Sequence, residues 1–197
     1  MAKSRRFKTL LSRLEILREH FLPRQFSPIG QYTMRQYDLA KAYVLFVHAE
    51  VEAFIEDRAR ERARKLERAW STKGSRSKGV RRLIHSHILH AKQPWQPIDW
   101  SPDRVTSAIN FYIWSIGNNH GIKEDNVCQM FFPLGIPYEE FDVTWLANMS
   151  SYGAARGSFA HTSIKTHQPV DPQNELSKVK RLVKGLAKLD RKITALG

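Results

Sequence analysis

The sequence has very little cysteine and no long apolar run. Cys128 is the single cysteine among 197 residues, which excludes an internal disulfide framework and a multi-cysteine zinc site. No apolar run approaches the roughly 20 residues that span a bilayer. The basic N-terminal residues are followed by an amphipathic pattern rather than by the apolar core of a secretory signal. We therefore predict a cytoplasmic protein with no membrane partner.

Acidic residues are also scarce relative to basic ones. The chain has 19 Asp and Glu residues against 32 Lys and Arg residues, which gives a net charge of +13 and a pI near 10.1. This excess favours an anionic partner, with nucleic acid as the first candidate and an acidic membrane surface as the second. Hydrophobic residues make up 42% of the chain, which is enough to form a core and excludes wholesale disorder.

Proline and glycine are missing from about Arg35 to Trp70, and this absence predicts one long helix. Its first half, "DLAKAYVLFVHAEVEAFIED", is apolar around most of its circumference, so we expect it to be buried. Its second half, "RARERARKLERAW", is highly charged, and pairs three or four residues apart are typical of a helix that projects into solvent. We interpret it as a solvated helical face, with a nucleic-acid track as the alternative.

Helical spacing of apolar residues recurs along the rest of the chain, and no convincing run of alternating strand residues interrupts it. Ser101, Pro102 and Asp103 form a helix-start pattern, and Asp142 is a suitable cap for a late helix that runs to His161. We predict an all-α helical bundle with a long second helix. We expect a helical domain over residues 1–167, followed over 168–197 by a linker and a basic amphipathic helix whose apolar stripe is interrupted by Asp190.

Three histidines gather in the segment "VRRLIHSHILHA", at His85, His87 and His90. On an ideal helix positions 85 and 87 lie about 200° apart, and positions 85 and 90 about 140° apart, so the three do not share one face. We therefore interpret them as surface or RNA-facing residues rather than as metal ligands, and we predict neither a metal site nor a cofactor. In the loop that follows, Trp95 and Trp100 either stack on bases or pack against the bundle.

The late helix ends in "RGSFAH", which places Arg156 five residues before His161. Arginine is charged at any physiological pH, whereas histidine titrates near neutrality. Five residues correspond to about 140° of net rotation, so one rigid helix does not bring the two side chains together. Either the helix changes its form near Gly157, or two copies of the helix meet across a twofold axis.

The segments "LFVHAEVEAFIED" and "LGIPYEEFDVTWLANMSSYGAARGSFAHT" resemble the HEPN superfamily (higher eukaryote and prokaryote nucleotide-binding), and most closely the RiboL-PSP type of HEPN ribonuclease. The shared features are an acidic residue before an aromatic one in a buried helix, here Glu52 and Phe54, and the R-x-x-x-x-H motif at the end of a late helix. The resemblance covers about residues 37–165. One departure is Gly157, where the family usually has a polar residue.

The resemblance implies a bundle that dimerises through the helix bearing the R-x-x-x-x-H motif. It also implies metal-independent endoribonuclease activity on single-stranded or loop RNA, in a toxin or antiviral defence effector that is sometimes restrained by an antitoxin or another defence-system partner. Because Gly157 departs from the family pattern, the alternative is a non-catalytic basic helical module that binds RNA or a protein partner.

RNA carries its own nucleophile, the 2′-OH, so its cleavage requires a base, an acid and positive charge on the phosphate. Histidine performs the first two tasks near neutral pH, and arginine binds phosphate oxygens through a bidentate fork. We therefore assign acid–base catalysis to His161 and stabilisation of the transition state to Arg156, with Glu52 orienting either of them. Further predicted contacts to the substrate come from Ser158, Thr162 and Tyr152.

Overall fold

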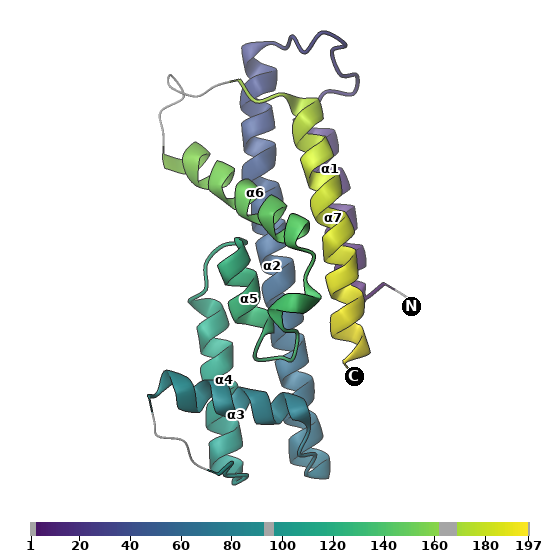
Figure 1. Cartoon of the computed structure of the whole chain (residues 1–197). Helices are drawn as coiled ribbons and strands as arrows, with labels where there is room; N and C mark the ends of the chain where they lie inside the picture. The colour runs from purple at the N-terminus through teal and green to yellow at the C-terminus, as the bar shows by residue number, and fades with distance from the viewer. Residues whose placement is uncertain (1–2, 93–96, 162–168, 197) are drawn as a thin grey trace. The chain divides into compact units, whose positions relative to one another are not determined.

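The structure is a computed structural model that describes residues 3–92, 97–161 and 169–196, with the backbone alone for residues 160 and 161. The predicted all-α fold is confirmed, and the described residues contain no strand. The helices are α1 (Arg5–Phe21), α2 (Met34–Lys73), α3 (Lys78–His90), α4 (Pro102–Gly117), α5 (Glu124–Phe131), the 3-10 helix η1 (Tyr138–Glu140), α6 (Val143–His161) and α7 (Pro172–Ala195) (Figure 1).

The chain divides into two compact units. The first unit contains residues 1–54, 121–124 and 142–197, and the second contains residues 55–120 and 125–141. Helix α2 is long enough to contribute to both, because its apolar first half belongs to the first unit and its charged second half to the second. The long second helix is thereby confirmed.

In the first unit, α1 and α7 are joined through a buried carboxylate. Ser4 caps α1 by accepting a hydrogen bond from the backbone N–H of Phe7. Its own backbone N–H and hydroxyl donate to the two carboxylate oxygens of Asp190 on α7, at 2.9 and 2.6 Å. Asp190 is 1% exposed, so the residue that interrupts the apolar stripe of α7 is a buried hydrogen-bond acceptor that holds the start of α1.

Helix α6 is fixed to α7 through Trp145. Asp142 begins α6, as predicted, by accepting a hydrogen bond from the backbone N–H of Trp145 at 3.1 Å. The indole N–H of the same residue donates to the carbonyl of Leu182 at 3.1 Å. The indole ring lies directly against the Cα of Gly185, where a Cβ would overlap it. The absence of a side chain at Gly185 therefore allows the two helices to approach closely.

The second unit is built from the second half of α2 with α3, α4 and α5. Ser77 caps α3 and Ser101 caps α4, and the predicted start of α4 at Pro102 is confirmed. Helices α3 and α4 cross in contact (Figure 1). The hydroxyl of Tyr112 on α4 donates to the carbonyl of Met130 on α5, which satisfies a polar group that is otherwise buried.

The charged half of α2 is not simply a solvated helix, so that expectation was wrong. Ala59 and Ala63 are fully buried and Leu66 is 3% exposed, and the spacing of these three residues forms one apolar stripe within the second unit. Arg58 and Arg62 flank this stripe and are 6% and 8% exposed. The stripe is difficult to recognise in the sequence, because two of its three members are alanines and most of their neighbours are charged.

We expect Gly185→Ala to destabilise the chain by roughly 1–3 kcal/mol, because its methyl group would displace the indole of Trp145 from a filled interface. The matched control is Gly157→Ala on α6, where a Cβ meets open space. The control should gain about 0.5–1 kcal/mol from the higher helix propensity of alanine. Urea unfolding followed by circular dichroism measures both changes, and equal stability of the two variants would contradict the packing described for Gly185.

Candidate functional site

The candidate site is centred on Glu52, in the first half of α2. His48 lies one helical turn earlier on the same face, and its Nδ1 is 3.6 Å from Glu52 Oε2. His48 is 4% exposed, whereas the Glu52 side chain is 22% exposed. The carboxylate therefore lies at the boundary between the core of the first unit and solvent, and the imidazole lies on the buried side of it.

The other carboxylate oxygen of Glu52 accepts a hydrogen bond from the backbone N–H of Gly121. Gly121 has a φ of 115°, which is a conformation that L side chains rarely adopt. The segment 121–124 is also joined to α6, because the backbone N–H of Glu124 donates to the hydroxyl of Ser150 at 2.9 Å. A short turn thus connects the Glu52 carboxylate to the helix that carries the R-x-x-x-x-H motif.

Arg156 lies on the side of α6 that faces this cluster. It follows Tyr152 by four residues and Met149 by seven, so it continues the stripe that these buried residues form. The Arg156 residue itself is exposed. Its positive charge is close enough to His48 to contribute to lowering the pKa of that imidazole. The structure therefore brings Arg156 and Glu52 to the same histidine.

The pKa of His48 is lowered from its ordinary value. Burial is the largest cause, because it disfavours the charged imidazolium; the Glu52 carboxylate acts in the opposite direction, and the Arg156 guanidinium lowers the pKa further. His48 is therefore a neutral imidazole at pH 7. Its Nδ1 faces Glu52, so the tautomer protonated at Nδ1 is the one that fits the carboxylate.

Sequence reasoning missed His48, although this residue lies within the segment that resembles the family. Its signal was the pairing of a histidine and a glutamate four residues apart within an otherwise apolar helix. Two polar residues on one face of a buried helix need each other or a third partner, since an unpaired buried polar group is costly.

The remaining predicted residues are dispersed. Ser158 is exposed on α6. Tyr152 is 2% exposed, so its ring packs inside the first unit, and burial raises the pKa of its hydroxyl. His161 is the last residue of α6. Thr162 and Trp95 lie outside the described residues, and Trp100 packs against Trp70 with ring centroids 5.8 Å apart.

Helix α6 is continuous from Val143 to His161. A change of helix form at Gly157, which was one of the two ways to bring Arg156 and His161 together, is therefore not found. Within one chain the two positions remain about 140° apart around the helix. If both residues act on one phosphate, the remaining arrangement is the one in which a second copy of the chain contributes to the site.

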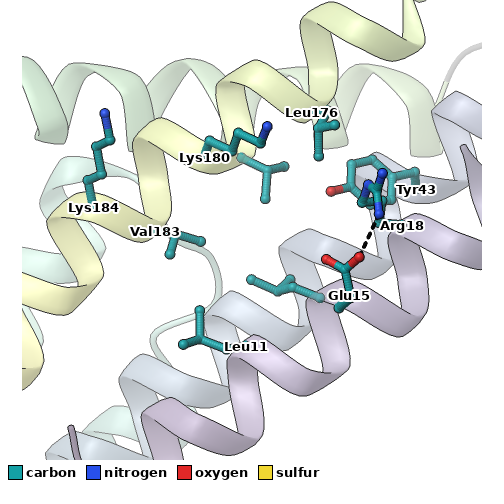
Figure 2. Close-up of a pocket in the computed structure, with 10 residues that line it drawn as sticks. Leu11, Glu15, Arg18, Tyr43, Leu176, Lys180, Val183 and Lys184 are labelled. Atoms are coloured by element: carbon teal, nitrogen blue, oxygen red, sulfur yellow. Dashed lines mark hydrogen bonds and ion pairs between the residues drawn. The ribbon is translucent and has the colours of Figure 1, made fainter. Parts of the chain in front are cut away.

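An open groove of about 440 Å³ lies elsewhere in the first unit, between residues of α1, α2 and α7 (Figure 2). Leu11, Leu176 and Val183 are apolar lining residues of this groove, and the Glu15–Arg18 ion pair and Lys180 are charged ones. Leu176 and Val183 belong to α7, the helix that was predicted to be basic and amphipathic. Glu52, His48 and Arg156 are not among its lining residues, so it is separate from the candidate site.

Two features are absent from the described part of the chain. None of its helices combines the length and apolar character needed to cross a membrane. Among the same residues, no three His, Cys, Asp or Glu side chains are grouped so as to hold a metal ion.

Comparison with known protein families gives a match over most of the chain. The model of the RiboL-PSP-HEPN family matches residues 8–194, which extends well beyond the segment of about 37–165 that carried the resemblance. The match begins within α1 and ends within α7. No curated protein and no solved structure matches the chain.

We expect the stability of the protein to fall on acidification, partly through His48. Folding lowers the pKa of His48 below its ordinary 6.5, so the unfolded chain binds this proton more readily. The resulting stabilisation is present above the unfolded pKa and is lost as the pH falls through the folded pKa. When the pH is lowered from about 7.5 to about 5.5, the melting temperature of His48→Gln should therefore fall less than that of the wild type.

The measurement is thermal unfolding followed by circular dichroism at both pH values. The pKa of His87, in the second unit, is lowered in the same direction, so His87→Gln serves as a comparison and the double variant should combine both effects. An identical loss in wild type and His48→Gln would contradict the environment described for this imidazole.

Proposed function

The chain belongs to the RiboL-PSP-HEPN family, and from this membership we propose that it is a metal-independent endoribonuclease that acts as a toxin or antiviral defence effector. The family assignment by itself supports a ribonuclease or a nucleotide-binding module. The observation that favours the nuclease is the convergence of Glu52 and Arg156 on His48, beside the helix that ends in His161.

The proposed reaction uses the 2′-OH of the RNA as nucleophile. A base removes the proton of this hydroxyl, its oxygen attacks the adjacent phosphorus, and an acid protonates the leaving 5′-oxygen. The products are a 2′,3′-cyclic phosphate and a 5′-OH. We assign the base and the acid to His161 residues, because the ordinary pKa of imidazole lies near the operating pH.

Arg156 is assigned to the phosphate. Negative charge on the non-bridging oxygens grows as the pentacoordinate phosphorus forms, and a guanidinium stabilises it through two parallel hydrogen bonds. Arg156 is exposed and therefore accessible to RNA. Glu52 is a positioning residue in this proposal, because its carboxylate is held by Gly121 and lies 3.6 Å from the His48 ring. Ser158 is an additional exposed hydroxyl on α6 for phosphate contact, and Thr162 is retained as a predicted contact.

We further propose that the active form is a homodimer joined along α6. The exposed positions 147, 151, 154 and 158 are Ala, Ser, Ala and Ser, and their spacing places them on one side of the helix. Such small residues allow a second helix to approach closely. Position 161 lies seven residues after Ala154, about 20° from it around an ideal helix. The stripe and the histidine position therefore share a side, and twofold pairing along it would bring two His161 residues together.

The alternative is a non-catalytic basic helical module that binds RNA or a protein partner. Gly157 favours this alternative, because the family usually has a polar residue at this position. A Cβ at Gly157 would meet open space, so packing does not explain why the polar residue is missing. A neutralising antitoxin or another defence-system protein remains an expected partner under either function.

We expect the purified protein to cut single-stranded RNA in the presence of EDTA and to leave 2′,3′-cyclic phosphate and 5′-OH ends. Arg156→Ala and His161→Ala should each reduce the rate by about 100-fold or more, because each removes a group that acts only in the transition state. Mass spectrometry of the products identifies the ends, and gel analysis of the cleaved RNA gives the rates.

The matched control is Arg181→Ala on α7, another exposed arginine of the first unit; it should cut RNA at a rate close to that of the wild type. If Arg156→Ala and His161→Ala both retain the wild-type rate, the site is assigned wrongly. If the wild type binds RNA without cutting it, the non-catalytic module is the better account.

Ala154→Arg should separate the subunits, because it places a long charged side chain in the middle of the small-residue stripe. The expected result is a dimer for wild type and a monomer for Ala154→Arg in analytical ultracentrifugation at micromolar concentration, with loss of cleavage in the variant. Because Ala154 is exposed, the variant should keep the helical content of the wild type. A wild-type chain that sediments as an active monomer would refute the shared site.

A further inference from the structure

The second unit carries a row of aromatic rings that the proposed catalytic site does not use. Phe111 on α4 lies in the middle of this row. Its ring centroid is 4.5 Å from that of His90 and 5.2 Å from that of His87, both on α3. On the other side it is 5.8 Å from Trp114, one turn further along α4. Four rings from two helices thus form a continuous cluster.

Part of this cluster faces solvent. Trp114 is 59% exposed, His90 is exposed and Phe111 is half-buried. The contact between α3 and α4 does not require these rings, because buried aliphatic residues on both helices already form an apolar core: Leu83, Ile84, Val105, Ala108 and Ile109. An exposed tryptophan beside further rings leaves apolar area open to water, and such area commonly marks a binding site.

The two helices that carry the rings also carry several basic residues. Residues 78–92, which include α3, contain Lys78, Arg81, Arg82 and Lys92 and no acidic residue. Arg104 lies seven residues before Phe111 on α4, so it occupies the same side of the helix. Burial lowers the pKa of His87, and the positive charge of Arg104 lowers it further, which is consistent with Arg104 lying near the ring row. An exposed apolar surface on helices rich in basic residues is suited to a ligand with flat apolar faces and an anionic backbone.

We propose that Trp114, Phe111 and His90 form a stacking platform for unpaired bases of single-stranded RNA. Each base offers a π-face to an aromatic ring whatever its identity, and nearby lysine and arginine residues attract the phosphates between the bases. A duplex does not fit this chemistry, since its base faces are covered by their neighbours. The platform rests on the proposed ribonuclease function for its biological substrate, and it adds a binding site for the unpaired bases of that RNA.

The test measures binding separately from cleavage. The probe is a fluorescent 2′-O-methyl oligonucleotide of about 12 nucleotides without self-complementarity; it lacks the nucleophilic 2′-OH and is not cut by the proposed reaction. Anisotropy should show that Trp114→Ala weakens its binding about tenfold. Trp114→Phe, which keeps an aromatic face, should bind within about threefold of wild type. Binding should also quench tryptophan fluorescence more in wild type than in Trp114→Phe.

Phe132→Ala is the matched control, because Phe132 is a 63% exposed aromatic residue of the same unit outside the ring row; its affinity should equal that of the wild type. His90→Ala is a second exposed variant and should also weaken binding. Wild-type affinity in both Trp114→Ala and His90→Ala would overturn the platform, and so would an equal loss for a blunt RNA duplex. A Trp114-dependent affinity in a protein that does not cut unmodified RNA would support the platform while refuting the ribonuclease function.

Discussion

The candidate site depends on how one carboxylate is held. Glu52 emerges from a largely buried helix, and its two oxygens have different neighbours: the backbone N–H of Gly121 and the imidazole of His48. Because a partly buried charge is costly unless it is paired, these contacts fix the Glu52 side chain. Arg156 acts electrostatically on the same histidine, so the cluster joins α2 to the end of α6 within the first unit.

The position of Arg156 in turn depends on how α6 is anchored. Asp142 fixes the start of the helix, Trp145 bonds to the backbone of α7, and Gly185 leaves room for the indole. This anchoring directs one stripe of α6 into the core of the unit and leaves the opposite stripe to solvent. Arg156 continues the buried stripe, whereas the small residues form the exposed one. The two members of the R-x-x-x-x-H motif thus occupy different sides of one helix, and the pairing proposed along the small-residue stripe concerns the His161 side.

Much of the fold was predictable because helices leave local signals. Apolar spacing, the caps Ser101 and Asp142, and the absence of proline and glycine before Trp70 located the helices to within a few residues. The charged half of α2 was misjudged, since alanine contributes little to a pattern of hydrophobicity. Asp190 was noticed only as an interruption, because its partner Ser4 lies 186 positions away in the sequence.

The sequence by itself determined the all-helical class, the excess of positive charge and the family, because composition, periodicity and a spaced motif are properties of the linear chain. It also supplied Arg156, His161 and Glu52 as candidates. Only the tertiary structure decided that His48 lies beneath Glu52, that Tyr152 is buried, and that Phe111, Trp114 and His90 meet. The physical reason is that burial and contact depend on which helix faces pack together, and helices distant in sequence fix that choice jointly.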